Sequence, residues 1–215
     1  SIILMDPRNG ACLLTAANLK LACGPKVGSL FLNMYNDEAC GRGGMAADAA
    51  AIASTIAGCQ STLQCVSLTE CKVTPQTLDA LAGCAGLRGL LIDGAYTNAA
   101  GVTTALMDAG MAGVIRSNPQ LRWLYVEVSR GPDFFGEECW KALHSGACPE
   151  LNVLWVDAVN RTSEHSGLTL APPVLIRSVL ASRPLLNLVM INPDLKLKSL
   201  HGPKDRLDGT KPKYI

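Results

Sequence analysis

Residues 63–73 read Leu-Gln-Cys-Val-Ser-Leu-Thr-Glu-Cys-Lys-Val, and the spacing of their apolar side chains decides the fold class. Apolar residues occupy the first, fourth and sixth positions, and a cysteine occupies the ninth. Alternating apolar residues at positions four and six predict a short strand that buries one face. The same spacing recurs from Leu87, Leu121, Leu151 and Leu185, which indicates that the chain is built from repeats.

Two weaker copies extend the repeat toward the N-terminus, at residues 27–32 and 2–4. Measured between fourth repeat positions, the spacing varies from 24 residues (66 to 90) to 36 residues (30 to 66). A one-residue shift would turn every side chain of a strand to its other face. We therefore expect the differences in length to lie in loops and helices. The pattern predicts about seven irregular repeats over residues 1–194.

Helical periodicity separates the predicted strands. Thr74 and Pro75 are typical of an N-cap and a first-turn proline, and they predict a helix through Ala82. Asn98 is the expected cap of the next helix. Later helices are predicted at residues 136–144 and 173–181. Proline ends the helix before three of the strands, in the pairs Asn118-Pro119, Cys148-Pro149 and Arg183-Pro184.

A strand, a helix and then Cys-Pro-x-Leu or Asn-Pro-x-Leu before the next strand resembles the ribonuclease-inhibitor-like and cysteine-containing leucine-rich repeats. The resemblance covers roughly residues 27–192. It implies an α/β leucine-rich-repeat solenoid, a horseshoe with parallel concave strands and convex helices. The chain departs from the family at the ninth repeat position, where only Cys71 fits well. The aligned residues are Ala95, Ser129, Val159 and Pro193.

Repeat positions three, five and seven should point to the concave face, because side chains alternate along a strand. Position five forms an apolar row, and acidic residues follow it at position seven. Exposed aromatic residues beside carboxylates are typical of a protein interface. In the alternative interpretation, these side chains pack against one another or are covered by an insertion. The candidate partner-binding residues are Phe31, Leu91, Asp93, Trp123, Tyr125, Glu127, Trp155, Asp157 and Val189.

Composition argues against several classes of partner. The net charge of +1 gives no field that would attract nucleic acid or an anionic membrane. No apolar run approaches the roughly 18 residues of a membrane-spanning helix. Nine scattered cysteines without a Cys-x-x-Cys pair predict no metal site and favour buried thiols in the cytoplasm or another reducing compartment.

No constellation of residues indicates catalysis or a bound cofactor. The three histidines, His144, His165 and His201, lie outside any recognisable nucleophile motif. Residues 195–215 leave the repeat pattern and are expected to form a basic, polar C-terminal tail.

The sequence therefore predicts a non-catalytic protein interaction module, or a scaffold subunit of a larger complex, that binds through its concave face. An alternative is a regulatory or inhibitory subunit that caps an enzyme. Nucleic-acid binding through the basic tail is a weaker alternative.

Overall fold

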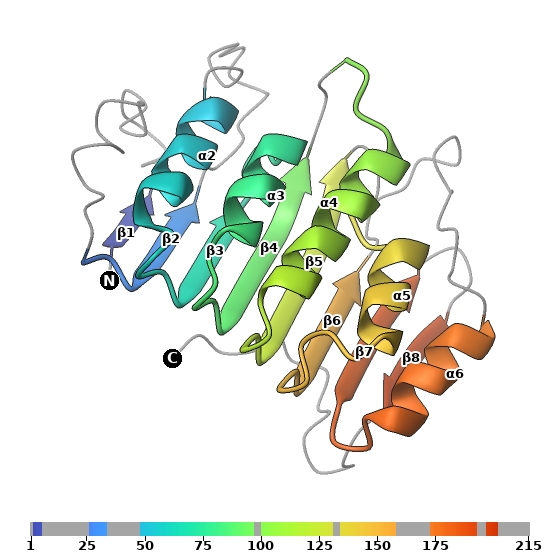
Figure 1. The fold of residues 1–215 in the computed structure, drawn as a ribbon. Helices are drawn as coiled ribbons and strands as arrows, with labels where there is room; N and C mark the ends of the chain where they lie inside the picture. Colours follow the sequence, from blue (N-terminus) through green and yellow to red (C-terminus); the bar gives the residue numbers. More distant parts are fainter. Residues whose placement is uncertain are drawn as a thin grey trace.

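A computed structural model describes residues 2–5, 26–33, 48–96, 100–130, 134–157, 173–192 and 197–201. Its strands form one sheet in chain order, and β1 to β7 are parallel while β8 is antiparallel to β7 (Figure 1). The strands are β1 (Ile2–Met5), β2 (Ser29–Asn33), β3 (Cys65–Thr69), β4 (Gly89–Tyr96), β5 (Trp123–Arg130), β6 (Val153–Asp157), β7 (Asn187–Asn192) and β8 (Leu197–His201).

The described helices all cover the same face of this sheet (Figure 1). They are α2 (Asp48–Cys59), α3 (Pro75–Ala82), α4 (Thr104–Ser117), α5 (Glu137–His144) and α6 (Pro173–Ser182). From β3 to β7, each strand is followed by one helix before the next parallel strand. The α/β class and the parallel sheet agree with the prediction.

The predicted strand register is confirmed in every parallel pair. The residues of the fourth repeat position pair with one another from strand to strand, in the order Ile2, Leu30, Val66, Leu90, Leu124, Leu154 and Leu188. Differences in repeat length therefore fall between the strands. The register could be predicted from the apolar pattern, because a slip of one residue would expose a row of buried side chains.

One continuous core lies between the sheet and the helices. The strands contribute repeat positions four and six, such as Leu124 and Val126, and the helices contribute Ile56, Leu81 and Met111. Burying each such side chain stabilises the fold by about 1.5–3 kcal/mol. The core therefore runs through successive repeats and joins them into one unit.

Helix α3 begins as predicted, and α4 does not. Thr74 is the N-cap of α3, and its amide donates a hydrogen bond to Thr77 Oγ1 at 3.3 Å. The cap of α4 is Thr103, whose Oγ1 accepts a hydrogen bond from the Leu106 amide at 3.3 Å. The prediction of Asn98 as this cap was wrong, and Asn98 lies outside the described residues. Gly101 has a φ of +79°, so the chain turns there before the helix starts.

In the last predicted copy of the hexamer, only the first position is displaced, by one residue, while Leu188 keeps the predicted fourth position. Leu186 is 1% exposed, whereas Leu185, the expected core residue, is 72% exposed. The Leu186 amide donates to the Arg183 carbonyl at 3.0 Å, as the Leu151 amide does to Cys148. The turn thus has the usual form, but Leu188 follows it one residue sooner than in the preceding repeat.

Part of the predicted tail is a strand. Residues 197–201 form β8, although residues 195–215 were expected to be a polar tail. Apolar side chains occur only at Leu197 and Leu200, so the segment carries little of the alternation that identifies a strand. The strand covers the edge of β7 that would otherwise present unpaired backbone groups.

Candidate protein-binding face

The face of the sheet opposite the described helices is here named the helix-free face. Repeat position five points to it, and its residues pair across the sheet in the order Ile3, Phe31, Ser67, Leu91, Tyr125, Trp155 and Val189. Phe31 is half-buried. Val189 is in register beside Trp155, and its side chain lies outside the described part of the chain.

The aromatic row is buried, so the expectation of an exposed apolar strip was wrong for its central residues. Leu91 and Tyr125 are each 2% exposed, and Trp155 is 6% exposed. These three residues form a cluster separate from the main core, and half-buried Trp123 packs against it. Register is one physical reason, because it sets large rings side by side on neighbouring strands. The Tyr125 and Trp155 rings stack with centroids 5.5 Å apart and an interplanar angle of 23°.

Trp123 occupies space that a missing side chain leaves open. A Cβ atom at Gly89 on β4 would lie 2.0 Å from an atom of the Trp123 indole. Glycine at this position of β4 therefore lets the indole lie flat over the neighbouring strand. Trp123 thus extends the buried cluster while remaining half-buried itself.

Two of the three predicted carboxylates have described side chains, and both are half-buried. Tyr125 Oη donates a hydrogen bond to Glu127 Oε2 at 2.5 Å, a short bond that fits a charged acceptor. Glu127 is in register with Asp157, whose side chain lies outside the described residues. The register between β4 and β5 shifts after Ile92, next to Asp93, so the acidic row is interrupted there.

Trp155 also has a buried polar atom with no partner. Its indole Nε1 is buried and makes no hydrogen bond. Most buried donors in proteins are paired, because an unpaired one costs about 1–3 kcal/mol. An acceptor supplied by a bound partner would satisfy this donor.

Cys65 on β3 is half-buried, and two neighbouring effects set the pKa of its thiol. Burial raises its pKa, and the nearby Arg88 guanidinium lowers the pKa by a smaller amount. Arg88 belongs to the next repeat, so no reading of the residues close to Cys65 in sequence would find it. With its pKa raised, the thiol is a weak nucleophile at neutral pH.

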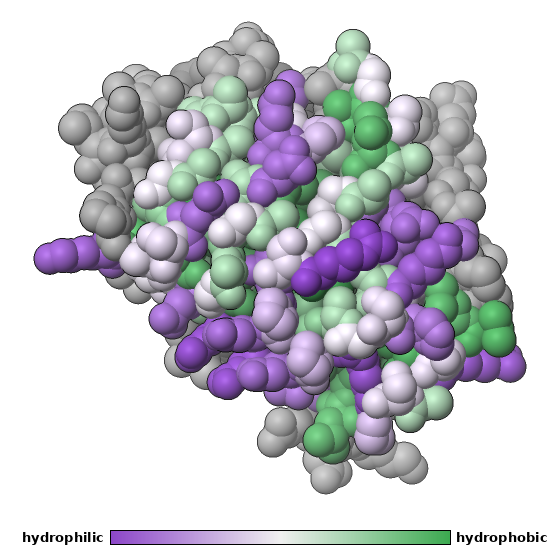
Figure 2. Space-filling view, viewed as in Figure 1, coloured by the Kyte–Doolittle hydropathy of each residue, from purple (hydrophilic) through white to green (hydrophobic). Residues whose placement is uncertain are grey.

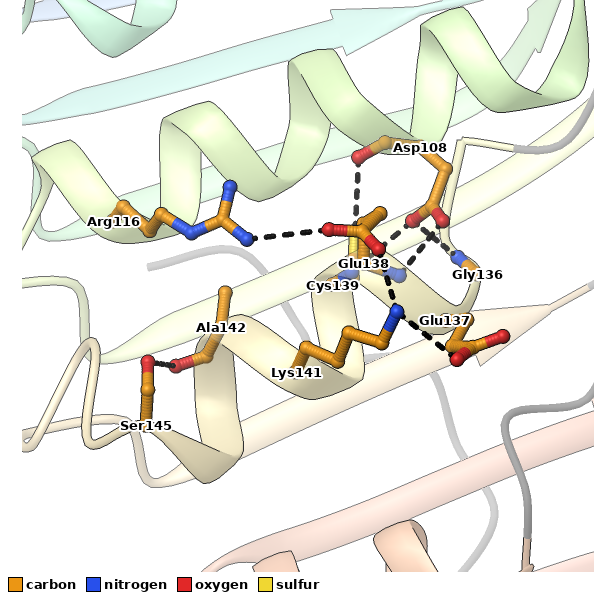
Figure 3. A network of polar contacts seen from close by, with 9 residues as sticks. All are labelled: Asp108, Arg116, Gly136, Glu137, Glu138, Cys139, Lys141, Ala142 and Ser145. Atoms are coloured by element: carbon orange, nitrogen blue, oxygen red, sulfur yellow. Dashed lines mark hydrogen bonds and ion pairs between the residues drawn. The ribbon is translucent and has the colours of Figure 1, made fainter.

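The sequence analysis missed a set of hydrogen bonds that join the repeats on the helix side. Asp108 of α4 is buried, and its carboxylate lies at the first turn of α5 (Figure 3). The carboxylate accepts hydrogen bonds from the amides of Gly136 at 2.8 Å, Glu138 at 2.9 Å and Cys139 at 3.1 Å. Asp108 therefore caps α5 from the neighbouring repeat, where the N-cap Gly136 has no side chain.

Hydrogen bonds also join neighbouring repeats at the C-terminal ends of the helices, and their donors are the residues that precede the three prolines. Asn118 Nδ2 donates to the Leu81 carbonyl at 3.3 Å, and Cys148 Sγ donates to the Ile115 carbonyl at 2.9 Å. Arg183 Nη2 donates to the Leu143 carbonyl at 3.0 Å and also to the Ala147 carbonyl. Each of these residues donates a hydrogen bond to the end of the helix in the preceding repeat. Their shared place before proline was the available signal, and it was interpreted only as helix termination.

The histidines outside this face lie apart from one another in the part of the chain that the structure describes. His144 Nδ1 lies 3.1 Å from Ser178 Oγ, but the pair is exposed on the helix side. His201 is in β8, and His165 is outside the described residues. Within the described ranges, no group of three or more His, Cys, Asp or Glu residues could hold a metal ion.

No helix among the described residues is long and apolar enough to span a bilayer. In comparisons with known proteins, no family model and no curated protein matches this chain.

Proposed function

We propose that this chain is a leucine-rich-repeat protein that binds another protein through its helix-free face and has no catalytic activity of its own. The repeat assignment is supported by seven parallel strands that pair at the same repeat position. The order of strand, helix and pre-proline turn also supports it. The protein would serve as an interaction module or scaffold subunit of a larger complex.

The observation that carries this proposal is the aromatic row on the helix-free face. Tyr125 and Trp155 form a stacked platform that the fold does not need for its main core. Trp123 packs against this cluster, and Phe31 lies in the same row on β2, three strands from Tyr125. Both are half-buried, so part of each residue is accessible to a partner. Aromatic side chains of this kind commonly dominate the free energy of protein binding.

The helix side has the character of a solvated surface. Hydrophilic and apolar residues are interspersed across it in Figure 2. Its charges pair with one another, as in the bond of Lys141 Nζ to Glu138 Oε1 at 2.8 Å and of Arg122 Nε to Glu150 Oε2 at 3.0 Å. Exposed ion pairs of this kind contribute little free energy.

The thiols support a reducing compartment such as the cytoplasm. Cys65, Cys84, Cys139 and Cys148 carry free thiols, and the last three of them are buried. Burial raises the pKa of Cys84 and of Cys148 to about 12. Protonated, buried thiols are typical of structural cysteines rather than catalytic ones.

The experiment compares the proteins that copurify with the tagged wild-type chain and with two double variants of it. Phe31→Ala with Trp123→Ala truncates the accessible aromatic residues of the helix-free face. Leu106→Ala with Val174→Ala truncates exposed apolar residues of α4 and α6 and serves as the matched control. Circular dichroism establishes that both are folded. We expect a partner that the wild type and the control recover and the first variant loses. Equal recovery by all three would contradict binding through this face.

A further inference from the structure

Two buried polar atoms on the helix-free face have no hydrogen-bond partner among the described residues, and they are opposite in kind. Trp155 Nε1 is a donor, and Asn187 Oδ1 is an acceptor. Trp155 is only 6% exposed, so its donor is shielded from bulk water. Unpaired buried groups of this kind are uncommon, because they lose hydration without gaining a hydrogen bond. A donor and an acceptor left in this state on one face indicate a ligand that carries both complementary groups.

The two residues lie on neighbouring strands. β7 pairs with β6 so that Asn187 is opposite Val153 and Val189 is opposite Trp155. Asn187 and Trp155 are therefore diagonal neighbours on the same face, because side chains two residues apart on a strand point the same way. A strand spacing of about 4.8 Å and a rise of about 3.3 Å per residue place their Cα atoms about 8 Å apart. One group of peptide size can therefore contact both side chains.

Neighbouring groups hold both side chains in place. Asn187 Nδ2 donates to the Asn152 carbonyl at 3.1 Å and to the Leu185 carbonyl at 3.5 Å. Carbonyl oxygens only accept, so the nitrogen faces them and Oδ1 remains the acceptor for a ligand. The Trp155 ring is stacked on Tyr125, with centroids 5.5 Å apart. Ordering the donor and the acceptor before binding lowers the entropy cost of binding.

A row of half-buried side chains lies beside this polar pair. Trp123, Val153 and Asn187 are in register on β5, β6 and β7, and all three are half-buried. The row lies two residues before the Tyr125 and Trp155 platform along the strands. A segment that lies along this row can reach the polar pair after small side-chain shifts, which are common when protein interfaces form.

A main-chain peptide group matches the polar pair in chemistry. Its carbonyl accepts from an indole N–H, and its amide N–H donates to a carboxamide oxygen. The carbonyl and the N–H of a trans peptide point in opposite directions, so one peptide group can bridge a donor and an acceptor on either side of it. A single ion would satisfy at most one of the two atoms, because Trp155 Nε1 only donates and Asn187 Oδ1 only accepts.

We propose that an extended segment of the protein partner lies along the row of Trp123, Val153 and Asn187. Trp155 Nε1 and Asn187 Oδ1 bind one main-chain peptide group of this segment. The presence of a protein ligand rests on the function proposed above. The affinity of the polar pair for a peptide group does not, and it can be measured on the isolated chain.

The first test titrates the isolated chain with N-methylacetamide, which carries one peptide group, and follows the indole N–H resonances by NMR. We expect a saturable shift of the Trp155 resonance and none for the core residue Trp140. N,N-dimethylacetamide keeps the carbonyl but has no N–H, so it should bind severalfold more weakly. Asn187→Ala should remove this difference between the two amides. Equal binding of both amides to the wild type would overturn the proposal, and so would the absence of a saturable shift, because the pair would then bind only water.

The second test uses Trp155→Phe, which removes the donor and keeps an aromatic ring. Recovery of the copurifying partner should fall about tenfold, because a partner carbonyl loses its donor. Trp140→Phe in the main core is the matched control, and it should lower the urea midpoint more than Trp155→Phe does while partner recovery stays at the wild-type level.

A loss of stability in Trp155→Phe as large as that in Trp140→Phe would overturn the proposal, because the donor would then be paired within the chain. Unchanged partner recovery in Trp155→Phe would also overturn it. The two proposals fail separately, since the amide titration needs no partner and copurification with the Phe31→Ala, Trp123→Ala variant does not depend on the Trp155 donor.

Discussion

The carboxylate of Asp108 is the contact between repeats whose removal should have the largest local effect. It accepts three backbone hydrogen bonds at the start of α5, and two of the donors, on Gly136 and Cys139, are buried. The first amides of a helix have no partner within the helix, so they depend on a cap. A negative charge at this position also favours the positive end of the helix dipole.

The magnitude follows from the donors that each substitution leaves unpaired. Asp108→Ala removes all three acceptor contacts, and each buried amide left without a partner costs about 1–3 kcal/mol. Two such amides give a loss of about 2–6 kcal/mol, out of a typical total stability of about 5–15 kcal/mol. Asp108→Asn keeps one oxygen that can serve Gly136 and Cys139 and loses the bond to Glu138. We expect it to cost about 1 kcal/mol.

The assay is urea unfolding followed by circular dichroism, together with hydrogen exchange of the α5 amides. Asp79→Ala on the exposed surface of α3 is the matched control, and it should change stability by less than about 0.5 kcal/mol. The amides of Gly136, Glu138 and Cys139 should exchange faster in Asp108→Ala than in the control. Equal unfolding midpoints and equal exchange for Asp108→Ala and Asp79→Ala would refute the capping role.

Three further predictions concern other contacts in the same chain. Arg183→Ala should lower stability by about 2–3 kcal/mol in urea unfolding, because the carbonyls at the C-terminal end of α5 and in the turn after it lose a charged donor, and Arg183→Lys should restore only part of it. Gly89→Ala should displace the Trp123 indole and shift its fluorescence to longer wavelength, and an unchanged spectrum would show that the indole does not lie over β4. Among the described thiols, Cys65 should react first with a thiol reagent at pH 8 and Cys148 far more slowly, because burial raises the pKa of Cys148 to about 12. Equal labelling rates in the folded protein would contradict that order.

The strands could be predicted from the sequence because their signal is local and strict. Apolar residues at repeat positions four and six must face the helices, and a single shift would expose them. Leu90, Leu124 and Leu154 therefore pair as the pattern requires. The buried leucine of the last turn could not be predicted, because residues 185 and 186 are both leucines. Only the geometry of the turn buries Leu186 in place of Leu185.

The burial of the candidate site could not be predicted, because it depends on contacts between segments distant in sequence. Alternation correctly assigns Tyr125 and Trp155 to the face opposite the helices. It does not determine what lies above them. The capping role of Asp108 was missed for the same reason, since its three donors lie about thirty residues further along the chain.

The two faces of the sheet carry separate sets of contacts. On the helix side, the continuous core and the bonds of Asn118 and Asp108 tie each repeat to its neighbours. Substitutions there should act on stability, which in a repeat protein depends on the contacts between adjacent units. The Tyr125 and Trp155 platform belongs to a cluster separate from this core. Because the two clusters are separate, substitutions in the Tyr125 and Trp155 platform should change stability less than substitutions in the continuous core.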